Sequence, residues 1–374
     1  MTCLRHLYTH RCHKLKSMPP GLGNLTNLRM LTCFVVGVPG PDCSDVAELQ
    51  NLNLGGQLEL RRMENVIEAK AKVANIGNKK DLRELTLRWT SVCDSKVLDN
   101  FEPRDGLQVL KIYFYGGEYM GMLQNMVEIH LVHCERLHFL FRCGTSFTFP
   151  KLKVLTLEHL LNFETWWEIN ERQEERIIFP LLEKLFIRHC GKLIALPEAP
   201  QLFIGKCGKL IALPEALLIE EASSRDYRLV RSPFPALKVL ELENLQSFLR
   251  WDAVEGTHVE HMFFPLLEKL SVQKCPKVID LSEAPKLSVL EIEDGKQEML
   301  CWVDKYLSSL TNLILKLEDI ERRSEAQCTL SVPVDSNEKW NQKSPLTVME
   351  LGCCNSFFGA GALEPWDYFV HLKN

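Results

Sequence analysis

The dominant feature of the sequence is a short pattern of apolar residues that returns along its whole length. One copy reads Leu-Glu-Lys-Leu-Phe-Ile-Arg-His-Cys-Gly-Lys-Leu over 182–193, and another reads Leu-Glu-Lys-Leu-Ser-Val-Gln-Lys-Cys-Pro-Lys-Val over 267–278. A less exact copy covers 126–137. One unit of this kind cannot bury its apolar residues alone, so the units must stack on one another into a continuous core.

The shared frame, L-x-x-L-x-L-x-x-C-x-x-L, is the leucine-rich-repeat pattern with Cys at its Asn/Cys position. The mean step of about 26 residues lies inside the roughly 20–29 residues that this repeat uses. We place repeat starts at 4, 25, 55, 82, 107, 126, 152, 182, 199, 237, 267, 287, 310, 346 and 369. The frame predicts an α/β fold over 1–374, a leucine-rich-repeat solenoid of about 14–15 irregular repeats with a parallel β-sheet on the concave face of a curved right-handed superhelix.

The steps between repeats are uneven, which predicts insertions. Residues 318–345, rich in Glu, Ser, Gln and Asn, are expected to form a loop insertion. Helical spacing of Val66, Ala69, Val73 and Ile76 predicts a helix over 66–76. The repeat at 199 is the weakest, and because no capping unit precedes or follows the frame, we expect a chain truncated at both ends.

Four repeats begin with Phe-Pro-x-Leu, at 149, 179, 234 and 264, where the proline predicts an extended segment just before the strand. The same frame explains the cysteines, because a small apolar side chain suits an inward-facing ladder at the turn after each strand. The cysteines in that phase are Cys12, Cys33, Cys134, Cys190, Cys207, Cys275 and Cys354.

Several classes of function are excluded. No Cys-x-x-Cys pair occurs, and where His133 and His138 lie near a thiol, Cys134 belongs to the inward ladder, so we expect no metal site. No cysteine is marked as an activated nucleophile, so we expect no catalytic residues and no enzyme. No phosphate-binding loop motif occurs, so we expect no cofactor. A net charge of −5 argues against nucleic acid, and no apolar run is long enough to span a membrane.

Two stretches carry a resemblance to a known family. Residues 15–37 follow the pattern L-x-x-M-P-x-x-L-G-N-L-T-N-L-R-x-L-x-x-F-V-V-G. Residues 58–89 combine L-x-L-x-x-M-E-N-V, an Ala/Lys-rich segment and L-x-x-L-x-L-x-W. Both resemble the repeat region of plant intracellular immune receptors of the coiled-coil, nucleotide-binding, leucine-rich-repeat class, and residues 350–366 are similar to members found in cereals.

The resemblance implies a non-enzymatic, cytoplasmic recognition module for plant defence. Its partners would be a pathogen effector or a guarded host protein, and the nucleotide-binding and coiled-coil domains of the parent receptor, whose switch it would restrain. An intracellular adaptor, such as the substrate-binding array of a ubiquitin ligase, remains the alternative. An F-box-like segment ahead of the repeats would favour the adaptor, and this sequence has none.

A binding surface is expected where outward residues flank the third leucine of each strand, because these residues form columns across the repeats. The columns shift from basic and aromatic residues to acidic ones from about residue 241, and Tyr113-Phe114-Tyr115 are expected to add exposed aromatic area. The residues expected to contact a partner are Arg88, Lys111, Tyr113, His130, Phe186, Arg188, Glu241, Glu243, Glu291 and Glu293.

Overall fold

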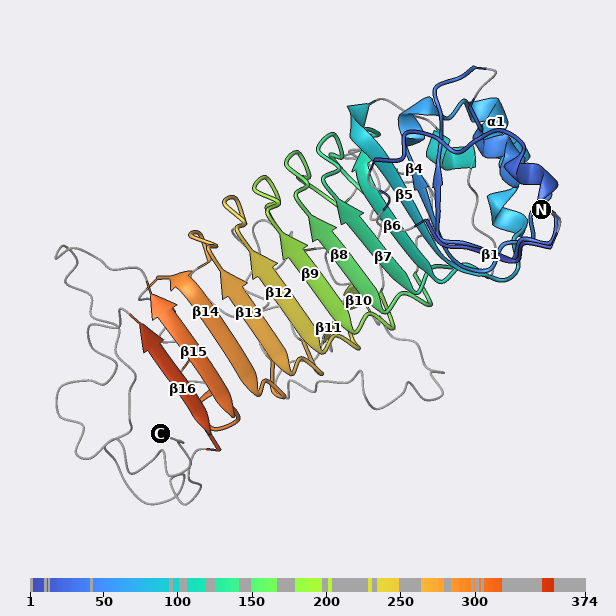
Figure 1. The fold of residues 1–374 in the computed structure, drawn as a ribbon. Helices are drawn as coiled ribbons and strands as arrows, with labels where there is room; N and C mark the ends of the chain where they lie inside the picture. Colours follow the sequence, from blue (N-terminus) through green and yellow to red (C-terminus); the bar gives the residue numbers. More distant parts are fainter. Residues whose placement is uncertain are drawn as a thin grey trace, which may run out of the picture. The chain divides into compact units, whose positions relative to one another are not determined.

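The computed structural model divides the chain into two compact units, each described here by itself. Unit 1 comprises Met1–Glu175 with His189–Gly191, and unit 2 comprises Arg176–Arg188 with Lys192–Asn374. Figure 1 shows the strands of both units. The structure describes residues 3–9, 12, 14–40, 43–93, 97–100, 106–118, 125–140, 149–166, 179–196, 201–203, 228–230, 234–248, 264–278, 284–296, 299, 303, 306–317 and 345–352.

The strands of unit 1 follow one another in a parallel ladder, as stacked repeats require. From β3 to β8, each strand pairs in parallel with the next one along the chain, and β1 pairs in parallel with β2. The strands are β1 (His6–Leu7), β2 (Met30–Leu31), β3 (Cys33–Val35), β4 (Gly56–Arg61), β5 (Leu82–Cys93), β6 (Val109–Tyr115), β7 (Glu128–Val132) and β8 (Val154–Glu158).

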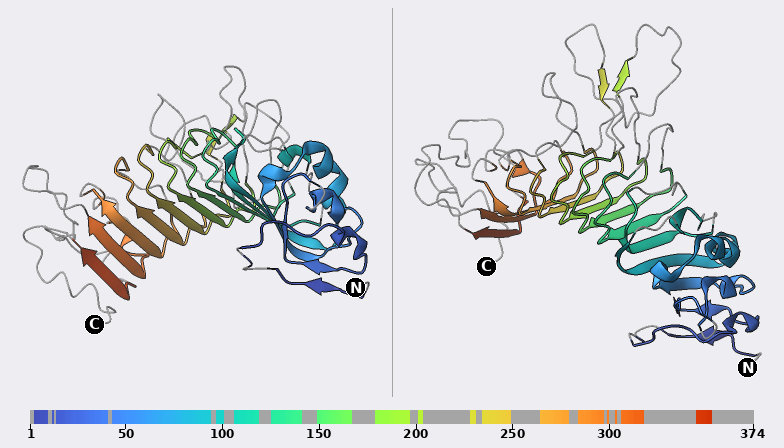
Figure 2. Two further views of the ribbon diagram at one scale, coloured as in Figure 1. Left: turned by 45° about the horizontal axis from the view of Figure 1, so that its top comes forward. Right: turned by 90° about the horizontal axis from the view of Figure 1, so that it is seen from above.

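The helical segments of unit 1 lie in the connections between its strands, as Figure 2 shows. They are η1 (Leu22–Asn24), η2 (Val46–Leu49), η3 (Met63–Asn65), α1 (Glu68–Ala74), η4 (Ile76–Asn78) and η5 (Val97–Asn100). Helix α1 confirms the helix expected at 66–76, and of the four residues at helical spacing Val66 and Ile76, which flank α1, are buried. Ala71 and Ala74 are buried, whereas Ala69 and Val73 are exposed, so the helix packs through its smallest side chains.

Unit 2 has a parallel ladder of its own, formed by β9 and β12 to β16. Its strands are β9 (Lys184–Arg188), β10 (Gln201–Phe203), β11 (Arg228–Val230), β12 (Val239–Glu243), β13 (Lys269–Gln273), β14 (Val289–Gly295), β15 (Asn312–Leu317) and β16 (Val348–Gly352). Because β9 pairs directly with β12, and β10 pairs antiparallel with β11, the repeat expected at 199 adds no strand to this ladder.

The core of each unit comes from the period-two alternation of the strands. In β9, Leu185 and Ile187 are fully buried, while the residues between and beside them face outward. The register places each such pair against the equivalent pair of the next strand, for example Leu185 against Leu240. Full burial of an aliphatic side chain contributes about 1.5–3 kcal/mol, so stacked leucines hold the repeats together.

The phenylalanine of each Phe-Pro-x-Leu motif is buried, and the three in unit 2 form a second buried column. Phe149, Phe179, Phe234 and Phe264 are at most 1% exposed. In unit 2 the rings of Phe179 and Phe234 stack at 5.6 Å, and those of Phe234 and Phe264 at 6.2 Å. The expected extended segment is in fact a turn, because the leucine at the fourth position donates its N–H to the carbonyl of the phenylalanine. Proline is favoured early in such turns.

Buried cysteines confirm the inward ladder. The thiols of Cys134, Cys190 and Cys275 donate to carbonyl oxygens in the preceding repeat at 3.8–3.9 Å. Burial raises the pKa of Cys134 to about 12 and that of Cys275 to about 11. These thiols stay protonated near neutral pH and serve as packing groups.

Cys33 is also fully buried, and desolvation raises its pKa to about 12. Cys12, in contrast, is exposed, so its assignment to the ladder was wrong. Among the described strands, β1 pairs only with β2, so the turn that carries Cys12 has a neighbouring repeat on one side alone. Cys207, Cys354, residues 318–344 of the expected loop insertion and the repeat start at 369 lie outside the described residues.

Candidate protein-recognition surface

In strands such as β7, β9 and β12, three outward side chains alternate with two buried ones, and we call the outward positions of the strands in each ladder the strand face. In a five-residue strand such as β7, they are the first, third and fifth residues, because the second and fourth are buried. Parallel register lines up equivalent positions of neighbouring strands into three rows. The columns expected from the sequence correspond to the second and third rows. The first row was not part of that expectation.

In unit 1 the register brings four of the expected site residues together. Lys111 lies beside His130 in the middle row, and Arg88 lies beside Tyr113 in the last row. The guanidinium carbon of Arg88 is 3.9 Å from the centre of the Tyr113 ring, a cation–π contact.

Each of these cations meets a carboxylate on the same face. Arg88 Nε is 3.1 Å from Glu59 Oε1, and Lys111 Nζ is 2.8 Å from Glu84 Oε1. Burial alone would raise the pKa of Glu59, but hydrogen bonds and charges from Arg61 and Arg88 outweigh it and lower that pKa. The face of unit 1 is therefore close to charge balance, and the expectation of a basic first half was wrong because the columns omitted Glu84.

His130 lies between charges of both signs. Its Nε2 is 3.6 Å from Glu128 Oε2, and its pKa is lowered mainly by burial, with the nearby Lys111 acting in the same direction. Glu128 and Glu84 oppose that shift. The imidazole is therefore held in its neutral form near pH 7.

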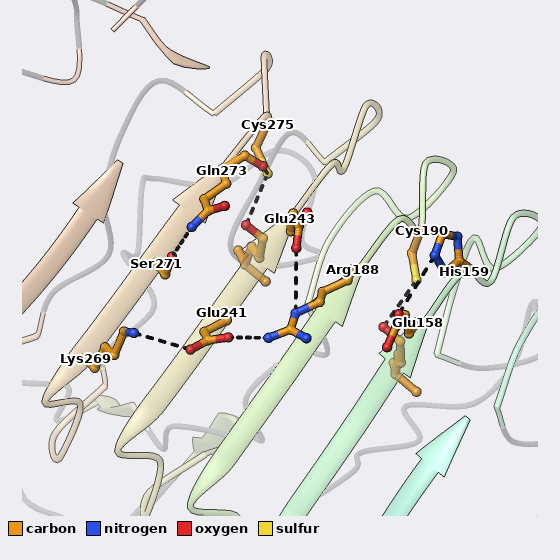
Figure 3. A network of polar contacts seen from close by, with 12 residues as sticks. Glu158, His159, Arg188, Cys190, Glu241, Glu243, Lys269, Ser271, Gln273 and Cys275 are labelled. Carbon is orange, nitrogen blue, oxygen red and sulfur yellow. Dashed lines mark hydrogen bonds and ion pairs between the residues drawn. The ribbon is translucent and has the colours of Figure 1, made fainter. Parts of the chain in front are cut away.

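The six remaining expected residues lie on the strand face of unit 2. Arg188 Nη2 is 2.7 Å from Glu241 Oε2, and Arg188 Nε is 3.7 Å from Glu243 Oε2. The Arg188 guanidinium also lies 5.5 Å from the centre of the Phe186 ring. Figure 3 shows Arg188 and Lys269 on either side of Glu241.

Lysines of neighbouring strands link the acidic residues of unit 2. Lys269 Nζ is 3.4 Å from Glu241 Oε1 and 3.2 Å from Glu291 Oε1, and Lys316 Nζ is 2.9 Å from Glu293 Oε1. Burial acts to lower the pKa of Lys269, but its two carboxylate partners raise it overall. The acidic columns are thus bridged by cations, and Lys269 belongs to the first row that the sequence columns left out.

The exposed aromatic area expected from residues 113–115 is present only in part. Tyr113 faces outward, but Tyr115 is 5% exposed and packs against the indole of Trp89, with ring centres 5.4 Å apart. Phe114 has φ 61°, so the backbone leaves the strand alternation at that residue. Tyr115 therefore contributes to the core, not to the face.

Phe114 begins a column of stacked rings in unit 1 that the sequence analysis missed. Its ring lies 4.9 Å from that of His133, which lies 4.4 Å from His159, which lies 4.3 Å from His189, with interplanar angles of 3°, 12° and 9°. All four residues have φ between 55° and 61°. The shared left-handed conformation is what aligns the rings of the three histidines.

Comparisons with known proteins agree with this architecture. Residues 46–160 match the family model described as R13L1/DRL21 LRRs. The chain is 28% identical over 286 residues to "Putative disease resistance protein RGA1" from Solanum bulbocastanum. It is 27% identical over 195 residues to "Putative disease resistance protein RGA4" from the same organism. No solved structure matches the chain.

The chain is a leucine-rich-repeat array that is similar to plant disease resistance proteins. The names of both relatives favour the receptor interpretation over the adaptor. The alignments cover 72% and 49% of the array, but only 28% of RGA1 and 19% of RGA4. The array therefore spans less than a third of the length of each relative it matches. Among its described residues, no helix has the length and apolar character needed to cross a bilayer.

Proposed function

We propose that the array is the non-enzymatic recognition module of a plant disease resistance protein and acts in the cytoplasm. Its strand face binds a pathogen effector or a guarded host protein, and it restrains a nucleotide-binding switch. The observation that carries this proposal is the ordered strand face of a chain whose curated relatives are named as disease resistance proteins.

The strand face suits protein recognition because its side chains are held in place before a partner arrives. Arg88 is fixed by Glu59 and Tyr113, and Arg188 by Glu241 and Glu243. Ordering side chains at an interface costs about 0.5–1.5 kcal/mol each, so pre-ordered arginines lose less on binding. Arg and Tyr are also the residue types that dominate interface energetics.

Restraint of the switch requires that the face bind its resting state more tightly than its active state. A ligand shifts a two-state equilibrium only through such a difference in affinity. An effector or host protein that occupies the same face would displace the switch and release it. The nucleotide-binding and coiled-coil domains of the parent receptor are the partners for the resting state.

The direct test is binding between the purified array and the purified nucleotide-binding region of a related disease resistance protein, measured by biolayer interferometry. Arg188→Glu breaks two ion pairs on the face and should weaken binding roughly tenfold or more, equivalent to about 1.4 kcal/mol. Lys238→Glu is the matched control, because Lys238 is exposed just before β12 and outside the strand face. Equal losses in both variants, or no binding by the unaltered array, would contradict the proposal.

A further inference from the structure

Unit 1 has a hollow on its strand face, with a volume of about 740 Å³. Its lining runs from Tyr8, just after β1, across β4 and β5 to Tyr113 of β6. The hollow exists because small residues occur where neighbouring strands carry long side chains. Gly56 has no side chain, and Thr86 lies in the middle row between Glu59 and Lys111.

The charged groups around the hollow cancel one another. Glu59 and Glu84 contribute two negative charges, and Arg88 and Lys111 contribute two positive ones, paired at 3.1 and 2.8 Å. An ionic group entering the hollow would have to compete with one of these pairs. An uncharged group would leave both pairs intact, so the lining favours an occupant without net charge.

Two tyrosines give the hollow its apolar character. The ring of Tyr113 carries the Arg88 guanidinium at 3.9 Å, which fixes both side chains. Tyr8, at the opposite end, is 60% exposed, a large value for an aromatic residue that lines a hollow. Aromatic rings that remain accessible beside a fixed arginine are typical of the anchor positions of protein interfaces.

The volume also constrains the occupant. Small-molecule pockets span about 300–1,000 Å³, so this hollow exceeds what a single side chain needs. It is continuous with the rows of the strand face, so an occupant that lies along the face can insert its tip here. A short protein segment with an aromatic residue and balanced charge meets these requirements.

We propose that this hollow is an anchor pocket that takes the aromatic, uncharged tip of a protein segment bound along the strand face. The assignment rests on the proposed function, in which the strand face binds proteins. It adds to that function the place where binding is concentrated and the chemistry of the segment that is recognised.

The test uses a phage-displayed library of random peptides selected on the purified chain. Enriched peptides should carry an aromatic residue and little net charge. Thr86→Trp fills the hollow and should weaken a selected peptide by roughly tenfold or more, about 1.4 kcal/mol. Lys153→Trp is the matched control, because Lys153 is exposed just before β8 and lies outside both the hollow and the strand face, and it should leave the affinity unchanged.

A second variant keeps the test decisive if Thr86→Trp perturbs folding. Tyr8→Ala removes an exposed ring and should weaken the peptide several-fold while the circular dichroism spectrum stays unchanged. Failure to enrich any peptide, enrichment of strongly charged peptides, or insensitivity to both variants would overturn the pocket. Peptides that are insensitive to both variants could instead bind more weakly to Phe186→Ala, a variant on the strand face of unit 2. That result would support binding at the strand face and contradict only the pocket.

Discussion

Lys79 offers a sharp test of how unit 1 holds its first connections in place. Its side chain is buried, and Nζ donates hydrogen bonds of 2.7 Å to the carbonyl oxygens of Leu49 and Leu52. Leu49 is the last residue of η2, and its carbonyl also accepts from the N–H of Leu52, whereas the Leu52 carbonyl lies at the end of the turn that follows. Lys79 thus connects the segment before β4 to the segment before β5.

Lys79→Met removes both donors while keeping most of the buried chain length. A buried acceptor without its partner costs about 1–3 kcal/mol, and because the Leu49 carbonyl keeps its hydrogen bond from the Leu52 N–H, this loss falls mainly on the Leu52 carbonyl. We expect a net loss of about 2 kcal/mol in the free energy of unfolding at pH 7. Lys80→Met, at the neighbouring exposed position, should change stability by less than about 0.5 kcal/mol.

The pH dependence gives an independent check. Burial lowers the pKa of Lys79 from 10.5 to about 8 in the folded chain. Between these two values the unfolded chain binds a proton that the folded chain does not, so the contribution of Lys79 to stability rises with pH. The gap between the unaltered chain and Lys79→Met should therefore widen from pH 8 to pH 10.

The assay is urea unfolding followed by circular dichroism at pH 7, 8 and 10, with Lys80→Met measured beside Lys79→Met. Two results would refute the reasoning. One is equal stability of the two variants at pH 7, and the other is a gap that stays constant or narrows as the pH rises.

Three further predictions follow from the ladders and the face. Cys134 and Cys275 should resist a thiol reagent in the folded chain at pH 8, while exposed Cys3 reacts quickly; rapid labelling of all three would contradict the buried ladder. His159→Asn, which tolerates the left-handed backbone, should lose two ring contacts and about 1–3 kcal/mol of stability in urea unfolding, whereas His159→Phe should retain most of it. Because burial lowers the pKa of His130, its neutral form supports the fold above about pH 6.5 and that support is lost as the pH falls, so His130→Gln should flatten the stability profile between pH 7 and 5.

Much of the fold follows from the repeat frame. The strands that begin at Val109, Glu128, Val154, Lys184 and Val239 each start two residues after an expected repeat start. The agreement arises because the first leucine of the frame packs beneath the connection and the next two alternate within the strand. The same frame placed the buried cysteines at 134, 190 and 275.

The sequence-based expectations were wrong or incomplete where a feature depends on how one repeat lies against its neighbours in space. The unit at 199 shares ten residues with its neighbour in sequence, yet β9 pairs directly with β12. Glu84 and Lys269 lie one row away from the expected columns, so the charge balance of the face could not be read from two positions per strand. The histidine column depends on a left-handed backbone at the same place in successive turns, and uneven steps between repeats conceal that alignment.

Lysine footprinting by mass spectrometry tests most directly whether the strand face is the recognition surface. Lys111, Lys269 and Lys316 lie on the face, whereas Lys153 and Lys238 are exposed just before their strands. On addition of the nucleotide-binding region, acetylation of the three face lysines should slow several-fold while the other two keep their rates. Protection of Lys153 and Lys238 with unchanged labelling of the face would contradict a recognition surface on the strands.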